Sequence, residues 1–88
     1  MKLVKVLWRD AEHSGEAWST LDEVKEFSDK DSLAESVGWI VYENEKFLVL
    51  AGDTDVNYEG ELYGRIFKIP KLMIKKISYL RADLLLDY

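Results

Sequence analysis

The sequence predicts a mainly β protein of the α+β class, an SH3-like small barrel of five antiparallel strands with one short helix after the first strand. Three observations predict it. Five short segments place apolar residues at the spacing of strands, one capping box marks a single helix, and a proline with one tight turn precedes the last strand. Closing the sheet would remove strand edges that otherwise pair with other chains. The alternative architecture is an open sheet covered on one face by the helix.

The first expected strand covers Leu3 to Arg9. Its apolar and basic side chains alternate, and successive side chains of a strand point to opposite faces of the sheet. The apolar residues that share one face are Val4, Val6 and Trp8. A polar loop over Asp10 to Trp18 follows, so the chain is expected to leave the sheet after this strand.

The only clear helix start lies at Thr20, which suits an N-cap position and is followed three residues later by Glu23. In a capping box, these two side chains satisfy backbone N–H groups that the first turn of a helix leaves free. We expect a helix over Leu21 to Ser28, with its apolar residues on one face. Those residues are Leu21, Val24 and Phe27.

Four further strands are expected in the second part of the chain. Their bounds are Glu35 to Glu43, Lys46 to Ala51, Leu62 to Ile69 and Ile74 to Leu80. Asn44 favours a hairpin turn after the first of them. An acidic loop is expected over Gly52 to Gly60, and a single tight turn over Lys71 to Met73.

Apolar residues occupy both faces of the two central expected strands. One face of Glu35 to Glu43 is expected to hold Val37, Trp39 and Val41, and the other Ile40 and Tyr42. We expect Trp39 to fill the core. A single small core cannot cover all of these residues and the tail Leu84 to Leu86 as well. The surplus therefore predicts a homo-oligomer, with packing of the tail onto its own barrel as the alternative.

Length and composition exclude several classes of protein. The 88 residues fit a single domain, 1–88, and the absence of cysteine excludes disulfides and thiolate metal sites. A net charge of −5 disfavours nucleic-acid binding, because phosphates require a concentrated basic face. No segment has the length or composition of a signal peptide or membrane span. We therefore expect a cytoplasmic protein without cofactors.

Neither catalytic nor metal-binding residues emerge from the sequence. His13 is the only histidine, and a triad would need Asp10 with Ser14 or Ser19. These candidates share one polar loop, and the sequence has no nucleophile elbow. The run that begins at Asp53 resembles a calcium loop, but Tyr58 stands where the sharp turn needs glycine. We therefore expect a protein that binds and does not catalyse.

Five residues form the candidate ligand site. A nucleotide-like ligand needs a flat ring surface, planar cations for phosphate and an acceptor for sugar hydroxyls. The residues that supply these groups are Arg9, Asp10, Trp18, Tyr63 and Arg65. The alternatives are that Trp18 packs onto the start of the helix as a hydrophobic staple, and that the charged residues form surface salt bridges.

Several short motifs resemble a group of small phage and prophage proteins of unassigned function, over about Leu3 to Leu80. The motifs are Val4 to Asp10, Trp18 before the helix start, Val37-Gly38-Trp39, and Ile69-Pro70-Lys71 with Ile74 and Ile77. The resemblance implies a phage accessory protein, and small phage proteins often counter host defence. It predicts an oligomeric sponge that sequesters a nucleotide immune signal. The alternative is an inhibitor or adaptor that blocks a host protein through one face of the barrel.

Overall fold

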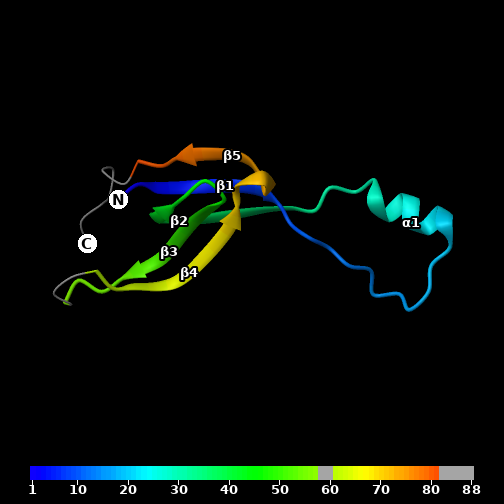
Figure 1. Ribbon diagram of the computed structural model, residues 1–88, viewed down its shortest axis with the longest axis horizontal. Coiled ribbons are helices and arrows are strands. Elements are labelled where there is room, and N and C mark those ends of the chain that lie inside the picture. Colours follow the sequence, from blue (N-terminus) through cyan, green and yellow to red (C-terminus); the bar gives the residue numbers. More distant parts are fainter. Residues whose placement is uncertain (58–60, 82–88) are drawn as a thin grey trace.

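The computed structural model describes residues 1–57 and 61–81, and it consists of one five-stranded antiparallel sheet and one α-helix (Figure 1). The strands are β1 (Leu3–Arg9), β2 (Leu33–Glu43), β3 (Phe47–Thr54), β4 (Tyr63–Pro70) and β5 (Ile74–Tyr79). The helix α1 (Leu21–Ser28) lies between β1 and β2, and the 3-10 turn η1 (Lys71–Met73) joins β4 to β5. The mainly β class and the place of the helix are therefore confirmed.

The strands lie in the order β4-β3-β2-β1-β5, so β4 and β5 form the two edges. In the described part of the chain these edges are not hydrogen-bonded to each other, and the sheet is not closed. η1 brings the chain from one edge to the other in a single turn, and the Lys71 N–H donates to the Lys46 carbonyl at 2.8 Å. The predicted closed barrel is thus not confirmed, although five antiparallel strands are present.

The core lies on the inner face of the curled sheet. Its fully buried side chains come from β1, β3 and β4, and they are Val4, Val6, Leu48, Leu50 and Ile69. Trp8 and Ile40 pack against them from β1 and β2. The centre of the Trp8 ring also lies 5.5 Å from the centre of the Phe67 ring on β4. Because β1 and β4 are not neighbours in the sheet, this contact shows that the sheet bends around its core.

A β-bulge at Val41 changes the faces expected for β2. Ile40 pairs with Leu50 on the core side, whereas Tyr42 pairs with Val49 on the opposite side. Ile40 and Tyr42 therefore do not share a face, because a bulge inserts one unpaired residue and shifts the alternation. Trp39 also lies on the outer face, where it pairs with Leu3 of β1, and not in the core.

The central hairpin forms as expected, but β3 runs further than predicted. Asn44 closes the turn, because its side-chain Oδ1 accepts hydrogen bonds from the N–H groups of Lys46 and Phe47. β3 continues to Thr54, since Asp53 and Thr54 pair with Gly64 and Tyr63 of β4. Backbone pairing therefore extends into the segment that was predicted, from its polar residues, to be a loop.

Residues 10–32, here called the arm, project beyond the end of the sheet and contain α1 (Figure 1). The molecule measures 56 × 28 × 26 Å, and its radius of gyration is 17.6 Å. A compact chain of this length has a radius of gyration of about 12 Å. α1 has no buried residue, so it does not cover the sheet. The alternative architecture is therefore right about the open sheet and wrong about the helix that would cover it.

Two residues cap α1 as the sequence predicts. The Glu23 N–H donates to Thr20 Oγ1 at 3.2 Å, and the Thr20 N–H donates to Glu23 Oε1 at 3.4 Å. Local hydrogen bonds thus define where the helix begins, even though tertiary packing does not support it. The expected tail Leu84 to Leu86 lies outside the described residues, as do Tyr58 and the two residues after it.

Candidate functional site

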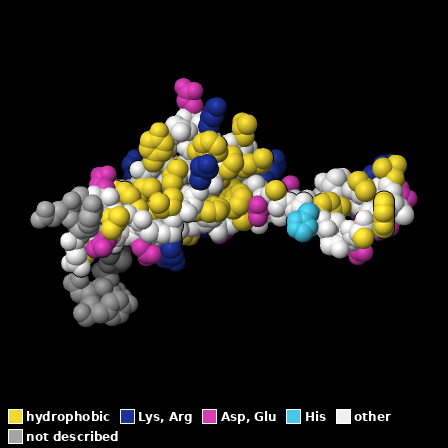
Figure 2. Space-filling model, turned by 60° about the horizontal axis from the view of Figure 1, so that its bottom comes forward, with side chains coloured by type: hydrophobic (Ala, Val, Ile, Leu, Met, Phe, Trp, Pro, Cys, Tyr) yellow, Lys and Arg dark blue, Asp and Glu magenta, His cyan; other side chains and the backbone are white. Residues whose placement is uncertain are grey.

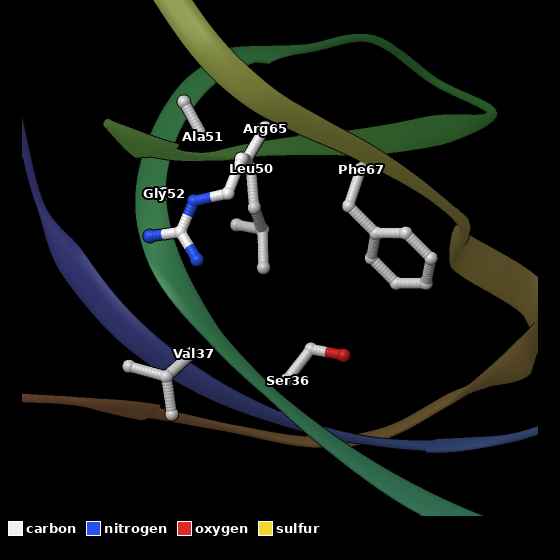
Figure 3. A pocket seen from close by; sticks show the side chains of 7 residues that line it. All are labelled: Ser36, Val37, Leu50, Ala51, Gly52, Arg65 and Phe67. Atoms are coloured by element: carbon white, nitrogen blue, oxygen red, sulfur yellow. The ribbon is translucent and has the colours of Figure 1, made fainter. Parts of the chain in front are cut away.

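A hollow of about 270 Å³ lies between β2, β3 and β4 (Figure 3). It is lined by Ser36, Val37, Leu50, Ala51, Gly52, Arg65 and Phe67. The hollow joins one cation, one hydroxyl and one aromatic ring around the same space. This volume is at the lower end of small-molecule sites, which occupy roughly 300–1,000 Å³.

Arg65 is held in place by its cross-strand neighbours. Its Nε donates to Asp53 Oδ2 at 2.7 Å and its Nη2 donates to Asp53 Oδ1 at 3.2 Å, a two-pronged ion pair. This hydrogen bonding lowers the pKa of Asp53 and raises the pKa of Arg65. Among the described residues, Nη1 of Arg65 has no hydrogen-bond partner, so it is available to a ligand.

The backbone around Arg65 is adapted to this position. Arg65 has φ of 50°, and no other non-glycine residue of the described ranges has a positive φ. Gly52 provides the space for the guanidinium, because a Cβ added there would lie 2.9 Å from Arg65 Nη2. Left-handed backbone is uncommon for residues with long side chains, and it is found most often at turns and functional sites.

Ser36 and Phe67 complete the hollow from β2 and β4. The Trp8 indole Nε1 donates to Ser36 Oγ at 3.0 Å. Because the oxygen accepts this bond, the hydroxyl hydrogen of Ser36 remains available for donation. The Phe67 ring stands at a tilt of 52° to the Trp8 ring and remains 41% exposed. A ligand ring can therefore contact a phenyl surface that the core already supports from behind.

The structure separates the five residues of the predicted ligand site. Arg65 lines the hollow, whereas Tyr63 lines a neighbouring depression with residues of the 53–57 segment. Desolvation and the nearby Glu61 raise the pKa of Tyr63. Arg9 is the last residue of β1, where it pairs with Leu33 next to the arm, and it does not line the hollow. Arg9 Nε forms an ion pair with Asp31 at 3.7 Å.

Asp10 and Trp18 belong to the arm and not to the hollow. The Asp10 N–H donates to the Ser32 carbonyl at 2.8 Å, which extends the β1–β2 pairing by one step. Trp18 is 92% exposed, so it does not pack onto α1 as a hydrophobic staple. Arg65 is thus the one predicted site residue that lines the hollow.

Sequence reasoning missed Ser36, Gly52, Asp53 and Phe67 as partners of Arg65. One signal was available, because Phe67 follows Arg65 at a spacing of two, which places both side chains on one face of a regular strand. The contacts with Gly52 and Asp53 depend on the β3–β4 register, in which Asp53 pairs with Gly64. That register is a tertiary property, and it could not be predicted because the polar composition of 52–60 indicated a loop.

The described residues provide neither a metal cluster nor a membrane-spanning helix. No group of three or more His, Asp or Glu side chains in residues 1–57 and 61–81 is placed to hold a metal ion. His13 lies in the exposed arm, with Nδ1 3.4 Å from the Ser14 carbonyl oxygen. No helix in this part of the chain is long and apolar enough to cross a membrane.

Fold and hollow together define a small antiparallel β protein with an arginine-containing hollow in its open sheet. No protein-family model, curated protein or solved structure matches the chain.

Proposed function

We propose that the protein is a non-catalytic binding module that takes a small nucleotide-like ligand in the hollow of Figure 3. The anionic group of the ligand would lie at Arg65, and its ring would lie against Phe67. The single observation behind this proposal is the guanidinium of Arg65, paired with Asp53, which lines the same space as the Ser36 hydroxyl and the Phe67 ring.

The chemistry of the three groups suits such a ligand. A planar guanidinium that is always charged binds phosphate or carboxylate oxygens. Arg65 offers Nη1 while Nε and Nη2 stay on Asp53, and Ser36 offers its hydroxyl hydrogen. Aromatic rings stack on nucleobases with about 1–3 kcal/mol per base. Because the hollow holds about 270 Å³, we infer that part of the ligand stays in solvent.

The proposal retains the sponge function that the phage resemblance predicts. A sponge only has to bind its signal, and the proposed mechanism involves no bond making or breaking. The strand order with one 3-10 turn between β4 and β5 supports a proposed SH3-like architecture, in which the hollow would be the open side of the barrel. The predicted cytoplasmic location belongs to the same proposal.

Isothermal titration calorimetry with adenosine 5′-monophosphate and with inorganic phosphate tests the hollow. Arg65→Gln should abolish measurable binding of both probes. Phe67→Ala should weaken binding of the nucleotide about ten-fold or more and leave phosphate unchanged. Gly52→Ala should displace the flexible end of Arg65 and reduce affinity without unfolding the sheet.

Arg9→Gln is the matched control, because Arg9 is also an ion-paired arginine but does not line the hollow. It should bind both probes as the wild type does. Equal losses for Arg9→Gln and Arg65→Gln would instead support the site predicted from the sequence. Unchanged binding in Arg65→Gln, or no binding of either probe by the wild type, would contradict the proposal.

A second candidate function, a protein-binding inhibitor or adaptor, is favoured by the apolar outer face of the sheet. Val37 and Ile66 are exposed there over 59% and 62% of their surface. Exposed apolar patches rimmed by charged residues are typical of protein interfaces. Under this alternative, Ile66→Asp would abolish binding to a host protein, whereas Arg65→Gln would not.

A further inference from the structure

The arm presents an apolar surface that has no cover within the described chain. Trp18 is 92% exposed, Leu21 67% and Val24 50%, and only Phe27 is partly buried. Figure 2 shows the arm as a separate lobe with apolar side chains on its surface, joined to the sheet by a narrow neck. An isolated helix shorter than about 12–15 residues is marginal in water, so an eight-residue helix needs a packing partner.

The arm is also strongly acidic. Residues 10–32 contain eight Asp or Glu residues and two Lys residues, although the whole chain has a net charge of only −5. The rest of the chain is therefore close to neutral. A partner for the arm must combine an apolar surface with basic side chains, because acidic residues surround the apolar ones.

The outer face of the sheet has this combination. One row of apolar residues crosses four strands in register, with Leu3 opposite Trp39, Trp39 opposite Ala51 and Ala51 opposite Ile66. The strand register places four basic residues on the same face, and these are Lys5, Arg9, Lys68 and Lys76. Glu35 and Asp53 are the acidic residues that alternation assigns to this face.

We propose that the arm of one copy docks on the outer sheet face of a second copy, and that the second copy returns its own arm in the same way. The apolar face of α1 would contact Ile66 and the exposed parts of Leu3 and Trp39, because Ala51 between them is already buried. The acidic residues of α1 would meet the lysines beside that row. Two equivalent contacts related by a two-fold axis close the assembly as a dimer.

The neck of the arm explains why the partner is a second copy and not the arm's own sheet. The Asp10 N–H donates to the Ser32 carbonyl at 2.8 Å, and Arg9 pairs with Asp31 at 3.7 Å. These contacts continue the β1–β2 pairing beyond the sheet, so the neck extends α1 away from the body (Figure 1). Docking on a second copy leaves these contacts intact.

The available area is sufficient for a stable dimer. An aromatic side chain such as Trp18 buries roughly 150–250 Å² when fully covered, and the exposed Leu21 and Val24 add to this area. Reciprocal docking doubles this contribution and covers the facing rows as well. The total reaches the range of specific interfaces, about 1,200–2,000 Å².

Sedimentation equilibrium of the full chain tests the dimer. The wild type should have twice the chain mass of 10.2 kDa at high micromolar concentration, and dissociation should increase between about 0.05 and 0.5 M salt as charges are screened. Leu21→Asp should yield monomers with an intact sheet, because α1 does not support the core. Leu72→Asp is the matched control on η1, where leucine is 98% exposed, and it should stay dimeric.

Mixing two variants, one with a defective arm and one with a defective outer face, tests whether the arm of one copy docks on the sheet of another. Leu21→Asp retains an intact outer face, and Ile66→Asp retains an intact arm. Each should be monomeric alone, whereas their mixture should form a heterodimer through the one intact contact. A monomeric wild type, a dimer unaffected by Leu21→Asp, or a mixture that stays monomeric would overturn the proposal. Nucleotide binding involves Arg65 and not these residues, so the two proposals fail independently.

Discussion

Apolar side chains in the core of the sheet are buried, whereas most of those in the arm are exposed. In the sheet, Val4 and Val6 are fully buried, and they pack with Leu48 and Ile69 from distant parts of the chain. In the arm, Leu21 and Val24 keep at least half of their surface exposed, although the spacing of their apolar face is as regular. Regular periodicity thus predicts which residues share a face, but it does not determine whether that face is covered.

This contrast predicts different consequences for the same substitution, with the largest effect in the sheet. Leu48→Ala should reduce the free energy of unfolding by about 2–5 kcal/mol, because it leaves a cavity in the core. Leu21→Ala should change it by no more than about 0.5 kcal/mol, as expected for an exposed residue. Urea denaturation in dilute solution, where copies do not associate, measures both. Equal losses would show that the arm packs onto its own sheet.

The sheet and the arm also differ in the space around their glycines. A Cβ on Gly38 would lie 2.9 Å from the Ala51 carbonyl oxygen and 3.1 Å from Leu50 Cβ, whereas a Cβ on Gly15 would meet no atom within 4 Å. We expect Gly38→Ala to destabilise the sheet by about 1–3 kcal/mol through overpacking. Gly15→Ala should be nearly neutral. Thermal denaturation of the two variants checks this, and a neutral Gly38→Ala would show that β2 and β3 can move apart.

The cap of α1 tests whether the arm unfolds by itself. Thr20→Ala should destabilise the helix by about 0.5–2 kcal/mol, because it removes the capping oxygen. The helical Cα chemical shifts of residues 21–28 should then decrease in NMR spectra, while the urea midpoint of the sheet stays constant. Ser19→Ala is the adjacent control and should preserve the shifts. A lower midpoint for the sheet would mean that the two regions unfold together.

The smallest effect concerns the ion pair of the sheet. Hydrogen bonding to Arg65 lowers the pKa of Asp53 below its ordinary value of 3.8. A lowered pKa in the folded state means that this pair stabilises the sheet above the pKa of the unfolded chain, about 3.9, and that the contribution is lost as pH falls through the folded value. Carboxyl ¹³C shifts measured during acidification should therefore show that Asp53 is protonated at a lower pH than an ordinary aspartate. In Arg65→Gln, Asp53 should be protonated at the pH of an ordinary aspartate. Identical titrations in both proteins would show that the pair does not persist in solution.

The local sequence alone determined the elements that depend on neighbouring residues. Thr20 and Glu23 define the start of α1 through hydrogen bonds three residues apart, and Asn44 closes its turn in the same local way. The alternation in Leu3 to Arg9 correctly assigned Val4, Val6 and Trp8 to the core side. These features need only short-range geometry, so one sequence is sufficient to predict them.

Only the tertiary structure decided where these elements lie relative to one another. The bulge at Val41 moved Tyr42 away from the face of Ile40, and the β3–β4 register placed Asp53 beside Arg65. Arg65 lines the hollow whereas Arg9 pairs with Asp31 of the arm, although both were assigned to one ligand site. Register, bulges and closure depend on residues distant in sequence, and similar alternating patterns are compatible with more than one of them. The local sequence therefore specified the strands, whereas long-range pairing determined which side chains meet at the hollow.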